Sequence, residues 1–439
     1  MTDALPIFMF IGLFLAILSG YPVAFALSGI AIIFGFIGHL AGVFYWTDMG
    51  FVPNRIFGIV QNYTLVAVPL FVFMGLVLSK SGIAEELLES VSRILGRFKG
   101  GLAYSVVIVG AVLAASTGIA GATVVTMGLL TLPTMLKKGY QPEVSSGVIV
   151  ASGTLGQIIP PSIILVLLGD MMSVDVGDLF MGAIIPGSIL IIAYLLYIKV
   201  LSIFKPEVFS NNLEEQPLQI SELPKTLLPP VFLMIVVLGS ILFGIASPTE
   251  AASCGAVGAL LIGLGKAKLS KDTLYAVTKE TVLITSMVFL LLIGAQFFGV
   301  VFRGINGEHL ITNFIETTKI TGGWLLFGMM ALLFFLGFFL DFLEICFIVI
   351  PIIQPIFLKL GFDPLWIAIL IAINLQTSFL TPPFGFALFY LKGVAPTAVS
   401  TAKIYRGAIP FVLIQLFVLT ILAKFPELVL WLPQNLFSK

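Results

Sequence analysis

The stretch SGTLGQIIPPS at residues 152–162 lies inside a long apolar run and contains two adjacent prolines. A second stretch, NLQTSFLTPPFG at residues 374–385, contains the same pair in a similar setting. Two consecutive prolines lack two amide donors and break an α-helix, so nearby carbonyl groups lose their intrahelical partners. We therefore expect two interrupted helices, each with backbone and hydroxyl oxygens free to bind a ligand.

The composition around these stretches is that of a membrane protein. Of 439 residues, 59% are apolar and 10% are charged, whereas soluble domains carry about 25% charged residues. A soluble enzyme is therefore excluded, and the balance of 22 basic and 22 acidic residues gives no overall field that would attract nucleic acid. Since backbone amides must be satisfied internally in a lipid bilayer, we expect an all-α polytopic membrane protein.

Two apolar runs do not have the length of a simple membrane span. Residues 100–136 contain no charged residue, and residues 322–358 contain only Asp341 and Glu344. A span needs about 20 residues, so each run is too long for one crossing and too short for two crossings and a turn. We expect two re-entrant helical hairpins beside ten ordinary spans, five in each half.

The hairpins belong to an internal repeat whose copies are 222 residues apart, the separation of Pro160 from Pro382 and of Gly139 from Gly361. Five spans are an odd number, so the second copy would enter the membrane in the opposite orientation, as in the inverted repeats of secondary transporters. The predicted domains are a first repeat at 1–204, a polar cytoplasmic linker at 205–225 and a second repeat at 226–439. Within them we expect arm helices at 82–98 and 305–319, hairpins at 100–136 and 322–358, and broken helices at 142–170 and 364–391.

The basic residues indicate the orientation of this arrangement. Of the 22 Lys and Arg residues, 16 fall on the side of the predicted linker and six on the other side. Basic residues are enriched in cytoplasmic loops, so the linker is predicted to be cytoplasmic and both termini periplasmic.

The predicted tip of the first hairpin reads ASTGIAGAT at residues 115–123. Small residues and hydroxyls would let the chain reverse at membrane depth and would leave oxygen atoms facing a cavity, and oxygen is the ligand that hard cations prefer. Close helix packing through small residues is the alternative explanation. Transporters place ions and substrate where a broken helix faces such a tip, which favours a binding site.

Asp341 and Glu344 are acidic groups near the predicted membrane centre, where an unpaired charge is costly. They would share a helix face if their segment is continuous, and they could bind a cation, carry a proton or stay protonated. We favour Na⁺ for Asp341. No phosphate-binding loop of the form GxxxxGK[ST] and no catalytic constellation occurs, so we expect no enzyme activity and no cofactor, with Na⁺ as the coupling ion of a gradient-driven transporter.

These motifs together resemble the large membrane subunit, of DctM type, of tripartite ATP-independent periplasmic (TRAP) transporters. The resemblance rests on the first hairpin tip, the two proline-pair segments and Lys392-Gly393, and it covers essentially the whole chain. It implies an elevator-type, Na⁺-driven importer in the bacterial inner membrane. Its implied partners are a periplasmic binding protein that delivers an organic acid and a small four-helix membrane subunit.

The resemblance also implies positions for the sites. Na⁺ would be held by Ser116, Thr117, Gly118, Gly153 and Thr154 in one region and by Gly337, Asp341, Thr377, Ser378 and Thr381 in the other. The substrate would lie among Thr123, Gln157, Pro160, Pro161, Glu344, Pro382 and Pro383. The second tip, GFFLD at residues 337–341, lacks the hydroxyls of the first.

Two questions stay open at this point. The chain could instead be a stand-alone carboxylate transporter of related repeat architecture, coupled to Na⁺ or H⁺. The acid is equally open: a C4-dicarboxylate, a 2-oxo acid and a sialic acid all fit.

Overall fold

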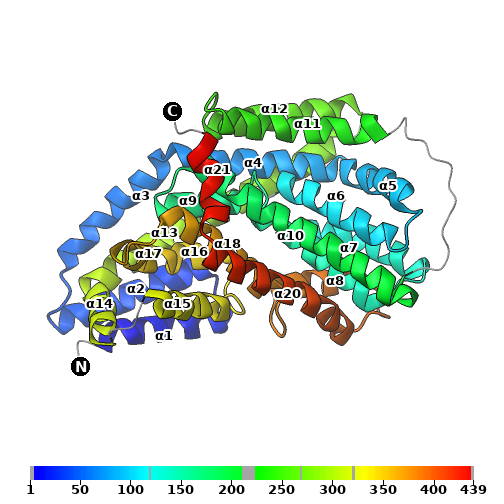
Figure 1. The fold of residues 1–439 in the computed structure, drawn as a ribbon. Coiled ribbons are helices and arrows are strands. Elements are labelled where there is room, and N and C mark those ends of the chain that lie inside the picture. Colours follow the sequence, from blue (N-terminus) through cyan, green and yellow to red (C-terminus); the bar gives the residue numbers. More distant parts are fainter. Residues whose placement is uncertain (1–3, 118–119, 210–222, 267–268, 319–321, 437–439) are drawn as a thin grey trace.

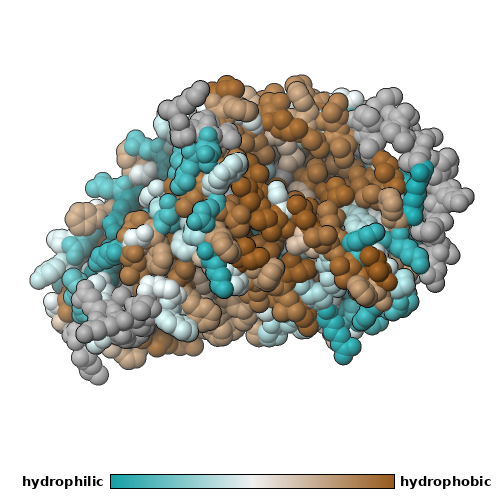
Figure 2. Space-filling model, in the orientation of Figure 1, coloured by the Kyte–Doolittle hydropathy of each residue, from teal (hydrophilic) through white to brown (hydrophobic). Residues whose placement is uncertain are grey.

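The computed structural model describes residues 4–117, 120–209, 223–266, 269–318 and 322–436, and within these ranges every regular element is a helix. The molecule is elongated, with α3 and α14 at one end and α5 at the other (Figure 1). Apolar residues cover the middle of the face in Figure 2, and hydrophilic residues gather toward its two ends. Large apolar side chains such as Phe232, Leu261 and Leu413 are exposed, as expected where a protein surface contacts lipid.

The first half of the chain supplies the following elements in order: α1 (Leu5–Leu18), α2 (Val23–Leu40), η2 (Trp46–Gly50), α3 (Phe51–Gln61), α4 (Tyr63–Lys80), α5 (Ile83–Leu95), α6 (Gly101–Thr117), α7 (Ala120–Lys137), α8 (Pro142–Thr154), η3 (Leu155–Gln157), α9 (Ile163–Met172), α10 (Val176–Phe204) and η4 (Pro206–Val208). The second half supplies α11 (Leu223–Leu242), α12 (Pro248–Gly265), α13 (Lys271–Gly304), α14 (Gly307–Thr318), α15 (Gly322–Leu336), α16 (Phe342–Ile348), α17 (Ile350–Lys359), α18 (Pro364–Leu380), α19 (Phe386–Val394), α20 (Thr401–Lys424) and α21 (Glu427–Leu436).

Local sequence signals explain where several of these helices begin and end. The side chain of Asp363 accepts hydrogen bonds from the first amides of α18, and Ser270 does the same for α13, as N-cap residues should. Gly139 follows α7 and Gly361 follows α17, with φ of 84° and 76°. Glycine favours this left-handed conformation, which closes a helix end. The same turn therefore recurs at positions that the sequence repeat relates.

Among the described residues, seven helices are long and apolar enough to cross a membrane, or eight if the bent pair α16 and α17 forms one span. The sequence predicted ten ordinary spans, of which six correspond to these helices; the seventh helix, α7, lies in the run at 100–136 that was predicted to form a hairpin. The difference arises partly because α1 has only 14 residues and because each broken helix is divided into shorter pieces. The bend of 57° between α16 and α17 likewise divides the second half of the run at 322–358.

Helices from the two halves of the chain pack against one another. Helix α4 packs on α12, and α2 packs on α13, so the long helices of one half pair with helices of the other. Helix α8 packs along α20 with the two backbones in close contact. A Cβ at Gly147 would lie 2.1 Å from the carbonyl oxygen of Gly407, and a Cβ at Gly407 would lie 2.0 Å from that of Glu143. Only glycine permits this approach of two backbones.

The short helix α5 occupies the range predicted for the first arm, and α14 occupies that of the second. Leu87, Leu88 and Val91 are buried on one face of α5. At the end of α12, Lys266 forms an ion pair with Glu86 of α5. Helix α5 also packs on α6, so it connects the first helix of the predicted hairpin to the α4–α12 layer.

One helix, α13, is longer than the sequence predicted, and two others were not predicted at all. The predicted span at 280–302 is only part of α13, which begins at Lys271 because charged residues end an apolar run without ending a helix. Helices α3 and α21 were not predicted. Both are short and lie outside the long apolar runs on which the prediction of spans depended.

Candidate functional site

The first broken helix ends in a close contact with α7. Helix α8 ends at Thr154, η3 continues to Gln157, and the proline pair separates η3 from α9. A Cβ at Gly153 would lie 2.4 Å from Cγ2 of Val124 and 3.0 Å from its backbone nitrogen. The glycine therefore brings the end of α8 against the beginning of α7, next to the buried Thr123.

The polar groups at this break are buried. Thr154 Oγ1 donates to the carbonyl of Ala151 over 2.9 Å, and Ser162 Oγ donates to that of Gln157 over 3.2 Å. The amide of Gln157 is 1% exposed, and its Oε1 has no hydrogen-bond partner in the described part of the chain. A buried acceptor without a partner is costly, so this atom has the capacity to accept from, or coordinate, a bound species.

The second broken helix meets the end of α15. A Cβ at Gly337 would lie 2.0 Å from Ser378 Oγ, which places the first turn after α15 directly on α18. The hydroxyls of Thr377, Ser378 and Thr381 each donate back to a carbonyl of α18, over 2.7–2.9 Å. Because the donors are used within the helix, the lone pairs of these hydroxyl oxygens remain for a cation.

Asp341 lies at the beginning of a helix, which differs from the continuous segment considered from the sequence. Helix α15 ends at Leu336 and α16 begins at Phe342, so Asp341 is the N-cap residue of α16. Its backbone N–H donates to Oε2 of Glu344 over 2.9 Å. The spacing of three residues therefore serves helix capping, and the two carboxyl groups do not form a stripe along one helix face.

The two broken helices lie together. Helix α18 contacts η3, α8 and α9, and α16 and α17 also contact α9. Tyr390 of α19 lies against the beginning of α7. A Cβ at Gly121, near the beginning of α7, would lie 2.8 Å from the Tyr390 ring.

Three polar residues at this convergence were absent from the predicted site. Gln376 is fully buried in α18, and neither its Oε1 nor its Nε2 has a partner among the described residues. Asn374 Nδ2 donates to the Met330 carbonyl over 2.8 Å and so holds α18 to α15. Tyr390 is the third. For Gln376 and Asn374, the sequence signal that could have identified them was a side-chain amide inside an apolar helix. For Tyr390, it was the only hydroxyl group of α19.

The remaining predicted residues differ in their placement. Gly118 lies outside the described residues, as do the side chains of Ser116 and Thr117 at the end of α6. Pro160 and Pro161 are buried, whereas Pro382 is half-buried and Pro383 is exposed. Both proline pairs contain a cis peptide bond, and the Pro383 carbonyl accepts a hydrogen bond of 2.7 Å from the Tyr405 hydroxyl.

The chemistry of the site is that of neutral oxygen ligands with two carboxyl groups. No cluster of three or more His, Cys, Asp or Glu side chains that could hold a metal ion occurs among the described residues. Hydroxyl, amide and carbonyl oxygens are suited to hard cations. The unpartnered oxygens of Gln157 and Gln376 fit the binding of such a cation or of a polar solute at this depth.

The architecture is that of known membrane transporters. The fold superposes on the YdaH transporter of Alcanivorax borkumensis with a TM-score of 0.63, over 87% of this chain and 88% of that chain, at 13% identity. It superposes on MtrF of Neisseria gonorrhoeae with a TM-score of 0.60, over 86% and 83%, at 12% identity. The protein is thus a polytopic membrane protein with a transporter fold.

Sequence comparison identifies the family. The model of the tripartite ATP-independent periplasmic transporter DctM component matches residues 10–428, and the chain belongs to this family. The sialic acid TRAP transporter large permease of Vibrio cholerae is 28% identical over 98% of this chain and 97% of its own length. The isethionate TRAP transporter permease of Oleidesulfovibrio alaskensis is 31% identical over 97% of this chain, which spans 66% of that relative. The protein is therefore an inner-membrane transporter permease and not an enzyme, as the sequence predicted.

Proposed function

We propose that this chain is the permease through which a TRAP system imports an organic acid, with Na⁺ as the coupling ion. One observation carries the proposal: two interrupted helices, one from each half of the chain, meet at a place where buried amide oxygens have no partner among the described residues. A solute bound between them would contact both halves of the protein. Unwound segments and half-helix ends are the parts from which transporters build their sites.

For Na⁺ we propose two regions. The first combines the end of α8, at Gly153 and Thr154, with the hairpin tip that contains Ser116, Thr117 and Gly118. The second combines Asp341 and Gly337 with Thr377, Ser378 and Thr381 of α18. The contact of Gly153 with Val124 and that of Gly337 with Ser378 support the pairing of a hairpin end with a broken helix in each region.

The substrate would lie between the two Na⁺ regions. Under this proposal Thr123, Gln157 and Glu344 would border this space together with Pro160, Pro161, Pro382 and Pro383, and we add Gln376 and Tyr390. Hydroxyl and amide groups, with the N-terminus of α16, can receive a carboxylate without a buried arginine. Each Na⁺ that enters down a potential of 100 mV supplies about 2.3 kcal/mol, which corresponds to an accumulation of about fiftyfold.

We base the proposed substrate class on the compounds for which the related transporters are named. Their names specify isethionate, sialic acid, C4-dicarboxylate and ectoine, and each of these small polar compounds carries an acidic group. We therefore propose an organic acid without choosing among them. The proposed partners are a small four-helix membrane subunit and a periplasmic substrate-binding protein, as the family name indicates a three-part assembly.

The proposed mechanism is an elevator movement within an inverted repeat. The arm helices α5 and α14 lie at opposite ends of the molecule (Figure 1), which supports an inverted relation between residues 1–204 and 226–439. Under this proposal the linker at 205–225 is cytoplasmic and both termini are periplasmic. The hairpins and broken helices would move together, while α4, α12, α2 and α13 would form the stationary layer.

Uptake into proteoliposomes tests the proposal. The chain would be reconstituted with and without its small subunit and binding protein, and labelled organic acids would be offered under an inward Na⁺ gradient. We expect accumulation only with both partners and only with Na⁺ outside. Accumulation by the chain alone would favour the stand-alone carrier, and equal uptake without a Na⁺ gradient would overturn the coupling.

A further inference from the structure

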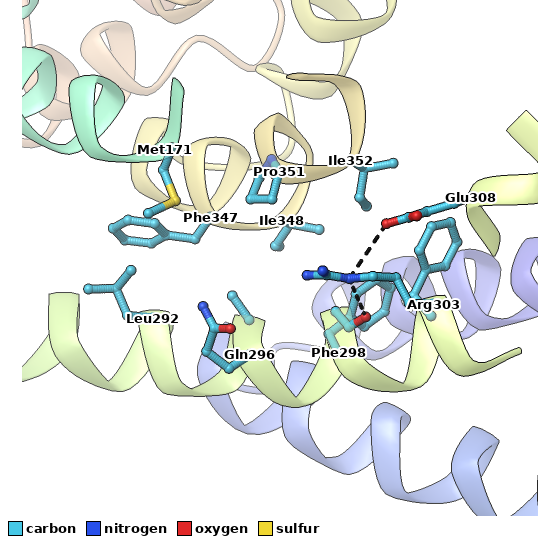
Figure 3. Close-up of a pocket in the computed structure, with 13 residues that line it drawn as sticks. Met171, Leu292, Gln296, Phe298, Arg303, Glu308, Phe347, Ile348, Pro351 and Ile352 are labelled. Carbon is cyan, nitrogen blue, oxygen red and sulfur yellow. Dashed lines mark hydrogen bonds and ion pairs between the residues drawn. The ribbon is translucent and has the colours of Figure 1, made fainter. Parts of the chain in front are cut away.

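A small pocket lies between α13 and the pair α16 and α17, at the end of α16 that carries Phe347 and Ile348 (Figure 3). Helix α13 contributes Gln296 and Arg303 to one wall, and α14 contributes Glu308. The facing wall, from α16 and α17, is apolar and includes Ile348 and Pro351. The pocket thus combines a hydrogen-bonding side with an apolar side.

The guanidinium of Arg303 is held in place through only one of its three nitrogens. Its Nε donates to the carbonyl of Gly299 over 3.3 Å and lies 3.5 Å from Oε1 of Glu308. Its two terminal nitrogens have no hydrogen-bond partner within the described ranges, and they point toward the space beneath Ile348 (Figure 3). Four N–H donors of this side chain therefore remain for a ligand.

A second arginine strengthens the positive character of the pocket. Arg55 Nη1, from α3, donates to Oε1 of Gln296 over 3.4 Å. Because this bond occupies the amide oxygen, the NH₂ group of Gln296 is left as a donor beside Arg303. The guanidinium of Arg55 therefore lies next to the polar wall of the pocket, to which Arg303 and Glu308 belong.

We propose that this pocket binds one oxyanion, a carboxylate or a phosphate, carried on an apolar body. The planar guanidinium fork matches the two oxygens of such a group, and the apolar wall would accept the rest of the molecule. The occupant would contact α13 on one side and the second hairpin on the other. A small amphiphilic acid and an anionic phospholipid share this chemistry, and two probes distinguish them.

The first probe is labelled octanoate, whose binding to the purified full-length chain would be measured by scintillation proximity, with octanamide as the uncharged competitor. The second is dioleoylphosphatidylglycerol, whose retention against dioleoylphosphatidylcholine would be counted by native mass spectrometry. Binding of octanoate alone identifies a small acid as the occupant. Selective retention of phosphatidylglycerol alone identifies a lipid, and both results together mean that the pocket accepts either.

Two variants test whether the pocket is responsible. Arg303→Gln removes the guanidinium fork. Ala295 of α13 also lines the pocket, and Ala295→Phe fills the pocket without changing its charge. Each should weaken binding of the recognised probe by at least about tenfold, since a charge-assisted bond or the space itself is lost. Arg97→Gln, at an exposed arginine outside the pocket, should leave binding unchanged.

Unchanged binding of both probes in both variants would overturn the proposal, as would failure of the unaltered chain to discriminate either anion from its neutral counterpart. The midpoint of thermal unfolding is measured in parallel. If Arg303→Gln lowers this midpoint because Glu308 loses its partner, Ala295→Phe decides the question, since it leaves that ion pair intact.

Discussion

Gly337 lies against Ser378 so closely that a Cβ on the glycine would be 2.0 Å from the serine Oγ. Gly337→Ala should therefore force the end of α15 away from α18. Overpacking of this kind costs about 1–3 kcal/mol. We expect a lower midpoint of thermal unfolding and loss of most Na⁺-driven uptake, measured in the proteoliposome assay.

The matched control for that variant is Gly328→Ala within α15, where a Cβ would meet no atom of the described residues within 4 Å. Alanine is favoured over glycine in a helix by about 1 kcal/mol, so this variant should be as stable as the unaltered protein or more so. Equal uptake by both alanine variants would show that the close contact has no role in transport.

Gln376→Leu separates a binding role from a structural one. Because neither amide atom has a partner in the described structure, an apolar side chain of similar size removes a desolvation cost and should not lower stability. If the amide contacts substrate or Na⁺, uptake should fall by at least about tenfold. Full uptake by a stable Gln376→Leu protein would remove this residue from the site.

Asn374→Leu provides the contrast to that variant. Its amide donates to the Met330 carbonyl over 2.8 Å, so the substitution removes a buried hydrogen bond that joins α18 to α15. We expect a loss of about 0.5–1.5 kcal/mol in the free energy of unfolding. Chemical denaturation would measure both variants, and the opposite order of their stabilities would contradict this reading of the two amides.

Asp341→Asn tests the proposed role of the carboxylate in Na⁺ binding. Asparagine is an N-cap residue as good as aspartate, so α16 should keep its beginning and the protein its expression. The Na⁺ concentration for half-maximal uptake should rise by about tenfold or more, because the charge that attracts the cation is lost. Asp363→Asn, at the N-cap of α18, is the control and should keep the original Na⁺ dependence.

An unchanged Na⁺ dependence in Asp341→Asn would leave helix capping as the whole role of Asp341. A large shift in both variants would point instead to general disturbance of the broken helix.

The ion pair between Glu86 and Lys266 should influence the coupling of α5 to the α4–α12 layer. Such partly exposed pairs contribute about 0.2–1 kcal/mol, so Glu86→Gln should alter the uptake rate by a few fold at most, and less at high salt. Glu89→Gln, which breaks only a pair with Arg93 inside α5, is the control. A double exchange, Glu86→Lys with Lys266→Glu, should restore the rate if the pair itself matters.

The positions of the helix breaks could be predicted from the sequence because proline acts locally. Each proline pair separates two helices whatever surrounds it, and Gly139 and Gly361 mark helix ends in the same way. The geometry at Asp341 could not be predicted, because it depends on α15 ending at Leu336. The run between Gly322 and Leu340 contains no proline, and its two signals, Gly337 after Leu336 and the capping-box spacing of Asp341 and Glu344, are compatible with a broken helix and with a continuous one.

The buried position of Gln376 without hydrogen-bond partners could not be predicted from the sequence either. Helix α18 is buried on all sides, so its apolar residues show no periodic face that would indicate which neighbour each residue meets. Periodicity identifies a helix only when one side differs from the other. The missing hydrogen bonds of Gln376 result from the packing of α18 with its neighbours, and such packing appears only in three dimensions.

The contact between Gly147 and Gly407 limits how the molecule can change shape. With no side chain between them, α8 and α20 cannot slide past each other without a collision of backbones, and Gln415 of α20 further donates to the Tyr194 hydroxyl of α10 over 2.6 Å. These contacts hold helices from opposite halves of the chain in a fixed position relative to one another. Helices α8, α10 and α20 must therefore move as one rigid body. This holds for any rearrangement that exposes the meeting point of the broken helices first to one side of the membrane and then to the other.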